Sequence, residues 1–189
     1  MERAAEGVYA PDRESMTLAA TNLNRQTSNL FLMGDLPLSV RVPIWVAIAL
    51  GLWACLAPSR VARSVWLIGG AAYLAHVCAV FHYIHHWSHS KALVHTAAMT
   101  HDVTGWSAAF GLYVNYAFTS AWVAYAIAGY LGPLPRWIRR VWCGWFLFMA
   151  FNGGIIFVLN PFRWLGVALF TAFGAATILR HFRQSKMPI

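Results

Sequence analysis

The chain has 189 residues, of which 59% are hydrophobic and only 11% are charged. Soluble domains carry roughly 25% charged residues, so this composition excludes an ordinary soluble protein and favours a membrane protein. The formal net charge is +8, which in a soluble protein would suggest nucleic-acid binding. Here the basic residues lie at the ends of apolar stretches, where they set the orientation of a membrane protein, so nucleic-acid binding is not predicted.

The first segment, residues 1–38, is polar and of mixed charge, and we expect it to be a disordered tail. It has no apolar core long enough for a signal peptide. Met16 or Met33 is an alternative start of translation, in which case part of this segment would not belong to the protein.

Five apolar stretches follow, each about the length needed to cross roughly 30 Å of hydrocarbon as a helix. Helices are expected because backbone polar groups find no water inside a bilayer. The predicted fold is therefore all-α, a five-helix transmembrane bundle over 39–183 with a short tail at 184–189. The predicted helices are 42–58, 64–89, 104–131, 137–160 and 162–180, the last two joined by a tight turn at Asn160–Pro161.

The basic residues are unevenly divided between the two sides of this bundle. Eight flank one side: Arg60, Arg63, Arg136, Arg139, Arg140, Arg180, Arg183 and Lys186. Three flank the other: Arg41, Lys91 and Arg163. Because basic residues favour the cytoplasmic side, the expected orientation is N-out and C-in, in a bacterial inner membrane. Tryptophans such as Trp66, Trp87 and Trp106 fall near the predicted span ends, where an amphipathic ring suits the interface.

Six of the eight histidines lie in one loop between the second and third predicted helices, HYIHHWSHSKALVHTAAMTH at 82–101. If the second helix continues to residue 89, four of them share one face, at positions i, i+3, i+4 and i+7: His82, His85, His86 and His89. Histidines four residues apart can reach one ion, as in His-Glu-x-x-His metalloproteases, although the glutamate is absent here. The stripe predicts a transition-metal site at the extracytoplasmic membrane face.

Further ligands follow in the same loop. His95, Met99 and Asp102 are spaced i, i+4 and i+7, and His101 lies nearby on another face. Imidazole suits zinc, copper and iron, and a methionine ligand favours copper. Two alternatives are haem ligation and a metal-free surface that titrates near pH 6 to 7 against lipid or a partner.

The segment HYIHH has the His-x-x-His-His form, with His82, His85 and His86. It resembles one of the boxes of membrane fatty-acid desaturases and hydroxylases, which together hold two irons for oxygen-dependent lipid chemistry. The resemblance implies a di-iron lipid hydroxylase or desaturase. This sequence has no second box of that form, and the charge bias places the first one outside, whereas the family's boxes face the cytosol.

His76 lies about 18 Å into the second span, deep in the hydrocarbon. Asn115 and Asn152 are expected at comparable depth, and we expect all three to face a common interior. An ionisable residue at this depth suggests a functional site, here a ligand of haem b or a proton relay. The structural alternative is a neutral histidine that hydrogen-bonds an amide and fastens helices together.

The sequence also permits a non-catalytic role, as a membrane subunit that packs against a larger complex. Its partners would then be membrane lipid and a membrane protein. The sequence leaves the catalytic residues unknown and does not decide whether the protein is an enzyme. The predicted spans contain no acidic residue, which disfavours an oxidase or hydroxylase and a proton-coupled transporter.

Overall fold

The computed structural model describes residues 36–158 and 161–185. The predicted tail up to residue 35, the alternative starts Met16 and Met33, and the proposed turn at Asn160 lie outside these residues. Within them the chain is helical and has no strand, so the all-α prediction is confirmed. The elements are α2 (Leu38–Leu56), α3 (Ser59–Tyr83), α4 (His89–Thr104), α5 (Gly111–Leu131), α6 (Arg136–Phe151), the π-helix η1 (Asn152–Ile156) and α7 (Phe162–Ser185).

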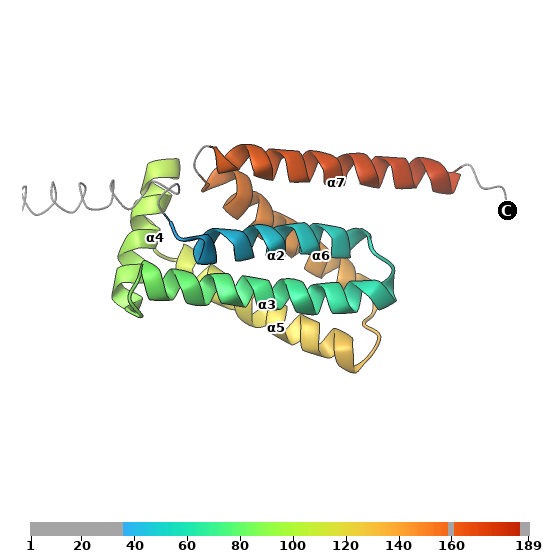
Figure 1. The fold of residues 1–189 in the computed structure, drawn as a ribbon, viewed down its shortest axis with the longest axis horizontal. Helices are drawn as coiled ribbons and strands as arrows, with labels where there is room; N and C mark the ends of the chain where they lie inside the picture. Colours follow the sequence, from blue (N-terminus) through green and yellow to red (C-terminus); the bar gives the residue numbers. More distant parts are fainter. Residues whose placement is uncertain (1–35, 159–160, 186–189) are drawn as a thin grey trace, which may run out of the picture. The chain divides into compact units, whose positions relative to one another are not determined.

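Three of the described helices are long and apolar enough to cross a membrane. These segments are Leu38–Leu56, Arg60–Tyr83 and Phe162–Arg183. The first two form a hairpin, and α5 packs beside α3 (Figure 1). In the same view α4 lies where α3 ends and α5 begins, whereas the α2–α3 and α5–α6 connections lie at the opposite end. The predicted bundle of five spans remains a prediction.

An aromatic cluster fastens α3, α5 and α6 together. The ring of Trp66 stands edge-on to those of Trp122 and Phe146, with centroids 5.7 and 5.1 Å away. The Trp122 indole N–H also donates to the backbone carbonyl of Trp66 at 3.0 Å. Trp66 is only 2% exposed, so it serves as a core residue and not as the interfacial anchor that its position near a span end predicts.

The predicted helix 137–160 is divided in the structure. Helix α6 ends at Phe151, and the chain continues as a π-helix in which the Phe157 amide donates to the Asn152 carbonyl at 2.8 Å. The Asn152 side chain donates back to the Phe148 carbonyl at 2.7 Å. A π-helix is wider than an α-helix and usually forms a single turn. Here this turn ends the regular α-helix at Phe151, so the predicted helix 137–160 is not one continuous α-helix.

Candidate metal site at the turn between α3 and α4

The histidine stripe predicted along one continuous helix is not formed. Helix α3 ends at Tyr83, six residues before the predicted end, and His89 already belongs to α4. The reason is local, because His86 and Trp87 adopt left-handed backbone conformations with φ of 49° and 58°. A left-handed residue cannot continue a right-handed helix. The i, i+3, i+4 and i+7 arrangement of residues 82–89 is therefore wrong.

Backbone hydrogen bonds show how the chain leaves α3. The amides of Ile84 and His85 both donate to the Val80 carbonyl, at 2.9 and 3.2 Å, and the Trp87 amide donates to the Phe81 carbonyl at 2.9 Å. A helix C-terminus is typically closed in this way, with its last carbonyls hydrogen-bonded and the following residues in a left-handed conformation. The new helix starts at once, because the Ser88 hydroxyl caps α4 by accepting from the Lys91 amide at 3.3 Å.

This turn separates the histidines of the His-x-x-His-His motif. His82 is exposed in the last turn of α3, with its ring 4.7 Å from that of Tyr83. His86 is exposed within the turn, whereas His85 is buried at 5% exposure. The di-iron reading of the motif stays a prediction, and this arrangement does not favour it.

The turn instead brings His85 against His95 of α4. The two ring centroids are 5.2 Å apart, with an angle of 63° between the rings, and the Phe81 ring covers His85 from a centroid distance of 5.3 Å. His85 is buried within the turn, and Ala92 of α4, about one helical turn before His95, is fully buried. Two imidazoles from different elements are thus held together in a partly enclosed corner.

Both imidazoles of the pair are held neutral. Burial lowers the pKa of His85 to about 4, and the neighbouring His95 and His86 add to this shift because each would repel a second positive charge. Burial also lowers the pKa of His95. A neutral imidazole keeps one unprotonated ring nitrogen, which is the form that binds a metal.

His89 takes a different partner from the one that a stripe predicts. Its Nδ1 lies 3.1 Å from the hydroxyl of Tyr116 on α5, and its ring packs edge-on to that of Tyr113. The contact ties the start of α4 to α5. Sequence reasoning did not identify these tyrosines, although their i, i+3 spacing places both on the side of α5 that His89 contacts.

The remaining predicted ligands lie along α4. Met99 is half-buried and follows His95 by one helical turn, so the two side chains share a face. His101 and Asp102 are exposed near the end of α4, with Nδ1 and Oδ1 3.9 Å apart. Among residues 36–158 and 161–185, no three histidine, cysteine or acidic side chains meet in a way that could hold a metal ion. A closed site of four such ligands is therefore not formed there.

The three polar residues expected in one membrane interior have separate partners. His76 Nδ1 lies 2.7 Å from the Val40 carbonyl, which fastens α3 to α2. Asn115 accepts a hydrogen bond from the Tyr73 hydroxyl at 3.2 Å, and Asn152 bonds within its own helix. The shared interior is therefore not observed, and the contact of His76 matches the structural alternative, with a backbone carbonyl as its partner. Haem binding at His76 is not tested by this geometry.

Comparisons with protein-family models, curated proteins and solved structures give no match to this chain. What the fold defines is an all-helical protein with three helices able to cross a membrane. The candidate site consists of buried His85 and half-buried His95 at one end of the α2–α3 hairpin.

Proposed function

We propose that this chain is a membrane protein that binds one copper ion, as Cu(I), between His85 and His95. The observation that carries the proposal is the 5.2 Å separation of the two ring centroids in a partly enclosed corner, where His85 is buried and His95 half-buried. The proposed site keeps the location of the metal site predicted from the sequence, but not its ligands. It uses His85 and His95 in place of the four histidines at 82–89.

The separation of the rings suits one shared ion. With a metal–nitrogen bond of about 2.0 Å, an ion lies roughly 3.2 Å from the centroid of each ligating imidazole. Centroids 5.2 Å apart then correspond to a nitrogen–metal–nitrogen angle of about 110°, which is close to tetrahedral. A tetrahedral ion needs further ligands beyond the two imidazoles, and Met99 lies on the same face of α4 as His95.

The available donors favour copper over zinc. Structural zinc sites use four ligands drawn mainly from cysteine and histidine, and the described residues bring no three such side chains together. Two imidazoles with a nearby thioether form a softer and more open set, and thioether ligands favour Cu(I). An open set also allows the ion to be passed on, so we propose reversible binding.

We further propose that α5 and the α6–η1 segment cross the membrane beside the three apolar helices, with the histidine corner on the extracytoplasmic side. Helix α5 has 21 residues, which is about 32 Å of helix and enough to span the hydrocarbon. The bias of basic residues toward the opposite end supports N-out, C-in orientation.

Copper titration of the full-length protein, purified in mild detergent without a histidine tag, tests the proposal. A chromophoric Cu(I) chelator competes with the protein under reducing conditions, and the titration gives stoichiometry and affinity. We expect one ion per chain. His85→Ala and His95→Ala should each weaken binding by about a hundredfold or more, because each removes a direct ligand. His101→Ala is the matched control, since this exposed histidine also lies on α4.

Other outcomes would replace the proposal. Equal losses in His101→Ala and His95→Ala would indicate non-specific binding to the histidine-rich loop. Stoichiometric iron without copper would favour the di-iron alternative, and a Soret band lost in His76→Ala would favour haem b. A colourless, metal-free protein that does not take up copper would favour the non-catalytic subunit.

A further inference from the structure

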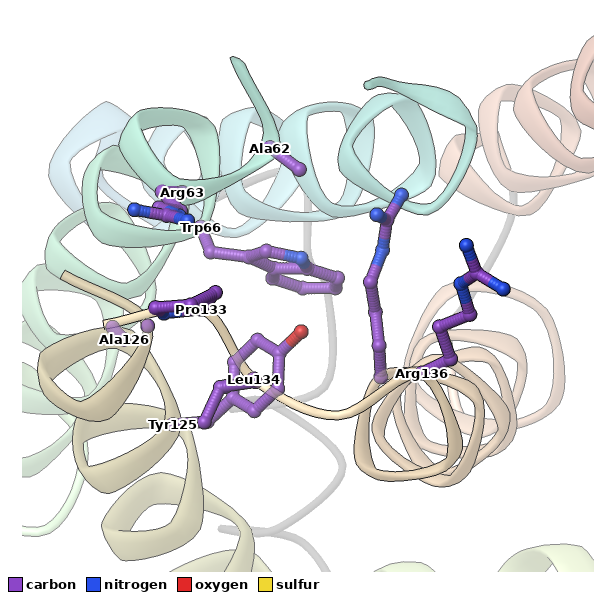
Figure 2. Close-up of a pocket in the computed structure, with 10 residues that line it drawn as sticks. Ala62, Arg63, Trp66, Tyr125, Ala126, Pro133, Leu134 and Arg136 are labelled. Atoms are coloured by element: carbon purple, nitrogen blue, oxygen red, sulfur yellow. The ribbon is translucent and has the colours of Figure 1, made fainter. Parts of the chain in front are cut away.

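A second candidate site lies at the opposite end of the helices from the histidine corner. It is a cavity of about 240 Å³ between the start of α3, the end of α5 and the start of α6. Arginines from two elements line it, Arg63 from α3 and Arg136 and Arg139 from α6, together with the rings of Trp66 and Tyr125. Figure 2 shows these aromatic side chains, with the Tyr125 hydroxyl directed into the space between Trp66 and α6.

Among residues 36–158 and 161–185, no carboxylate balances the positive charge at this cavity. Five of the six acidic side chains of the chain precede residue 36, and the sixth, Asp102, lies on α4. Helix α4 is at the other end of the hairpin (Figure 1). Arg139 donates to the Ala57 carbonyl at 2.7 Å, but within the described residues no ion pair engages Arg63 or Arg136. Uncompensated guanidinium groups in a cavity attract an anion.

The tryptophan beside the arginines is deeply buried. The Trp66 side chain lines the cavity and is 2% exposed, and its indole nitrogen has no hydrogen-bond acceptor among the described residues. A buried N–H without an acceptor costs about 1–3 kcal/mol.

We propose that this cavity binds a phosphate-bearing anion, with the headgroup of an anionic phospholipid as the source. Arginine is the side chain best suited to phosphate, because its planar fork donates two parallel hydrogen bonds to a pair of oxygens. Basic pockets between transmembrane helices on the cytoplasmic side are typical binding sites for anionic headgroups.

The depth of the cavity agrees with a headgroup. Its residues lie near the start of α3, near the end of α5, at the start of α6 and in the α5–α6 connection. They therefore stand about where a spanning helix leaves the hydrocarbon. Tyr125, which is half-buried, supplies an aromatic wall of the kind that is common at this level. The proposal is independent of copper binding, because the two sites occupy opposite helix ends.

Lipid binding is tested on the full-length protein in nanodiscs of phosphatidylcholine with and without phosphatidylglycerol. Native mass spectrometry counts the lipids that stay bound after release from the disc. We expect one retained phosphatidylglycerol and about a tenfold weaker retention in Arg63→Gln and Arg136→Gln, since each removes a charge-assisted hydrogen bond. Arg140→Gln is the matched control, because Arg140 is an exposed α6 arginine that does not line the cavity.

A second arm separates lipid from free anion, by adding inorganic phosphate to protein in detergent without anionic lipid. Phosphate binding that depends on Arg63 and Arg136 would support the site with a soluble phosphate as the source. Equal retention of phosphatidylcholine and phosphatidylglycerol would overturn the proposal. An equal loss in Arg140→Gln would overturn it too, because general surface charge would then explain the attraction. Thermal unfolding of each variant confirms that it is folded.

Discussion

His85 and His95 meet although the first lies in a turn and the second in the helix that follows it. Their rings are 5.2 Å apart because the chain reverses through two left-handed residues and then re-enters a helix at Ser88. The relationship depends on the break in the helix, since a continuous helix would carry these two residues progressively farther apart along its axis. The turn therefore creates the candidate site that the predicted stripe was expected to supply.

The pH dependence of the corner follows from the lowered pKa of His85. An unfolded histidine titrates near pH 6.5, whereas His85 in the folded protein titrates at about 4. As the pH falls from about 6.5 towards 4, the unfolded chain takes up a proton that the folded chain excludes, so stability decreases. Thermal unfolding followed by tryptophan fluorescence should give a lower midpoint at pH 5 than at pH 7. His85→Gln should show a smaller difference, and a higher midpoint at pH 5 in the native protein would contradict the account.

Gly70 allows α3 to approach α5. A Cβ placed at Gly70 would lie 2.8 Å from the indole nitrogen of Trp122, closer than real contacts allow, and that nitrogen is held by its bond to the Trp66 carbonyl. We expect Gly70→Ala to destabilise the fold by about 1–3 kcal/mol through overpacking. Gly144→Ala is the control, because a Cβ there meets no atom within 4 Å. Chemical denaturation in detergent compares the two, and equal stability would show that the Trp122 contact is not constrained.

Ser88 fixes the start of α4 by capping the Lys91 amide. Ser88→Ala should cost about 1 kcal/mol of helix stability, the usual effect of losing an N-cap. Amide hydrogen exchange should therefore speed up in the first turn of α4, and Cu(I) affinity should fall because His95 is positioned by this helix. Ser90→Ala changes an exposed serine that makes no cap, and should leave both quantities unchanged. Unaltered exchange in Ser88→Ala would argue against the cap.

The sequence predicts the all-α fold class well, because a composition rich in long apolar stretches is enough to indicate membrane-spanning helices. Long apolar stretches predict helices wherever water is absent, and α2, α3, α5 and α7 overlap the predicted segments. Their bounds differ, since α3 ends at Tyr83 and α5 begins only at Gly111, seven residues after its predicted start. The segment after residue 88 is rich in helix formers and forms α4. The π-helix after Phe151 is not predicted, because the two glycines that follow Asn152 are equally typical of close packing between helices.

The candidate site was predicted in location but not in geometry. Helical spacing treats residues 82–89 as one rod, and no residue there is a proline or a glycine that would predict its end. The left-handed conformations fall on His86 and Trp87, and such conformations are uncommon for residues other than glycine. The arginine cavity was also missed, because its residues come from three helices whose packing no local pattern reveals.

X-ray absorption at the copper edge of Cu(I)-loaded protein measures the ligands of the ion directly. The account predicts nitrogen neighbours at about 2.0 Å with the multiple-scattering pattern of two imidazoles. One imidazole should disappear from the spectrum of His95→Ala, and the spectrum of His101→Ala should match that of the native protein. A coordination shell that is identical in native protein and in the double variant His85→Ala, His95→Ala would contradict copper binding at this pair.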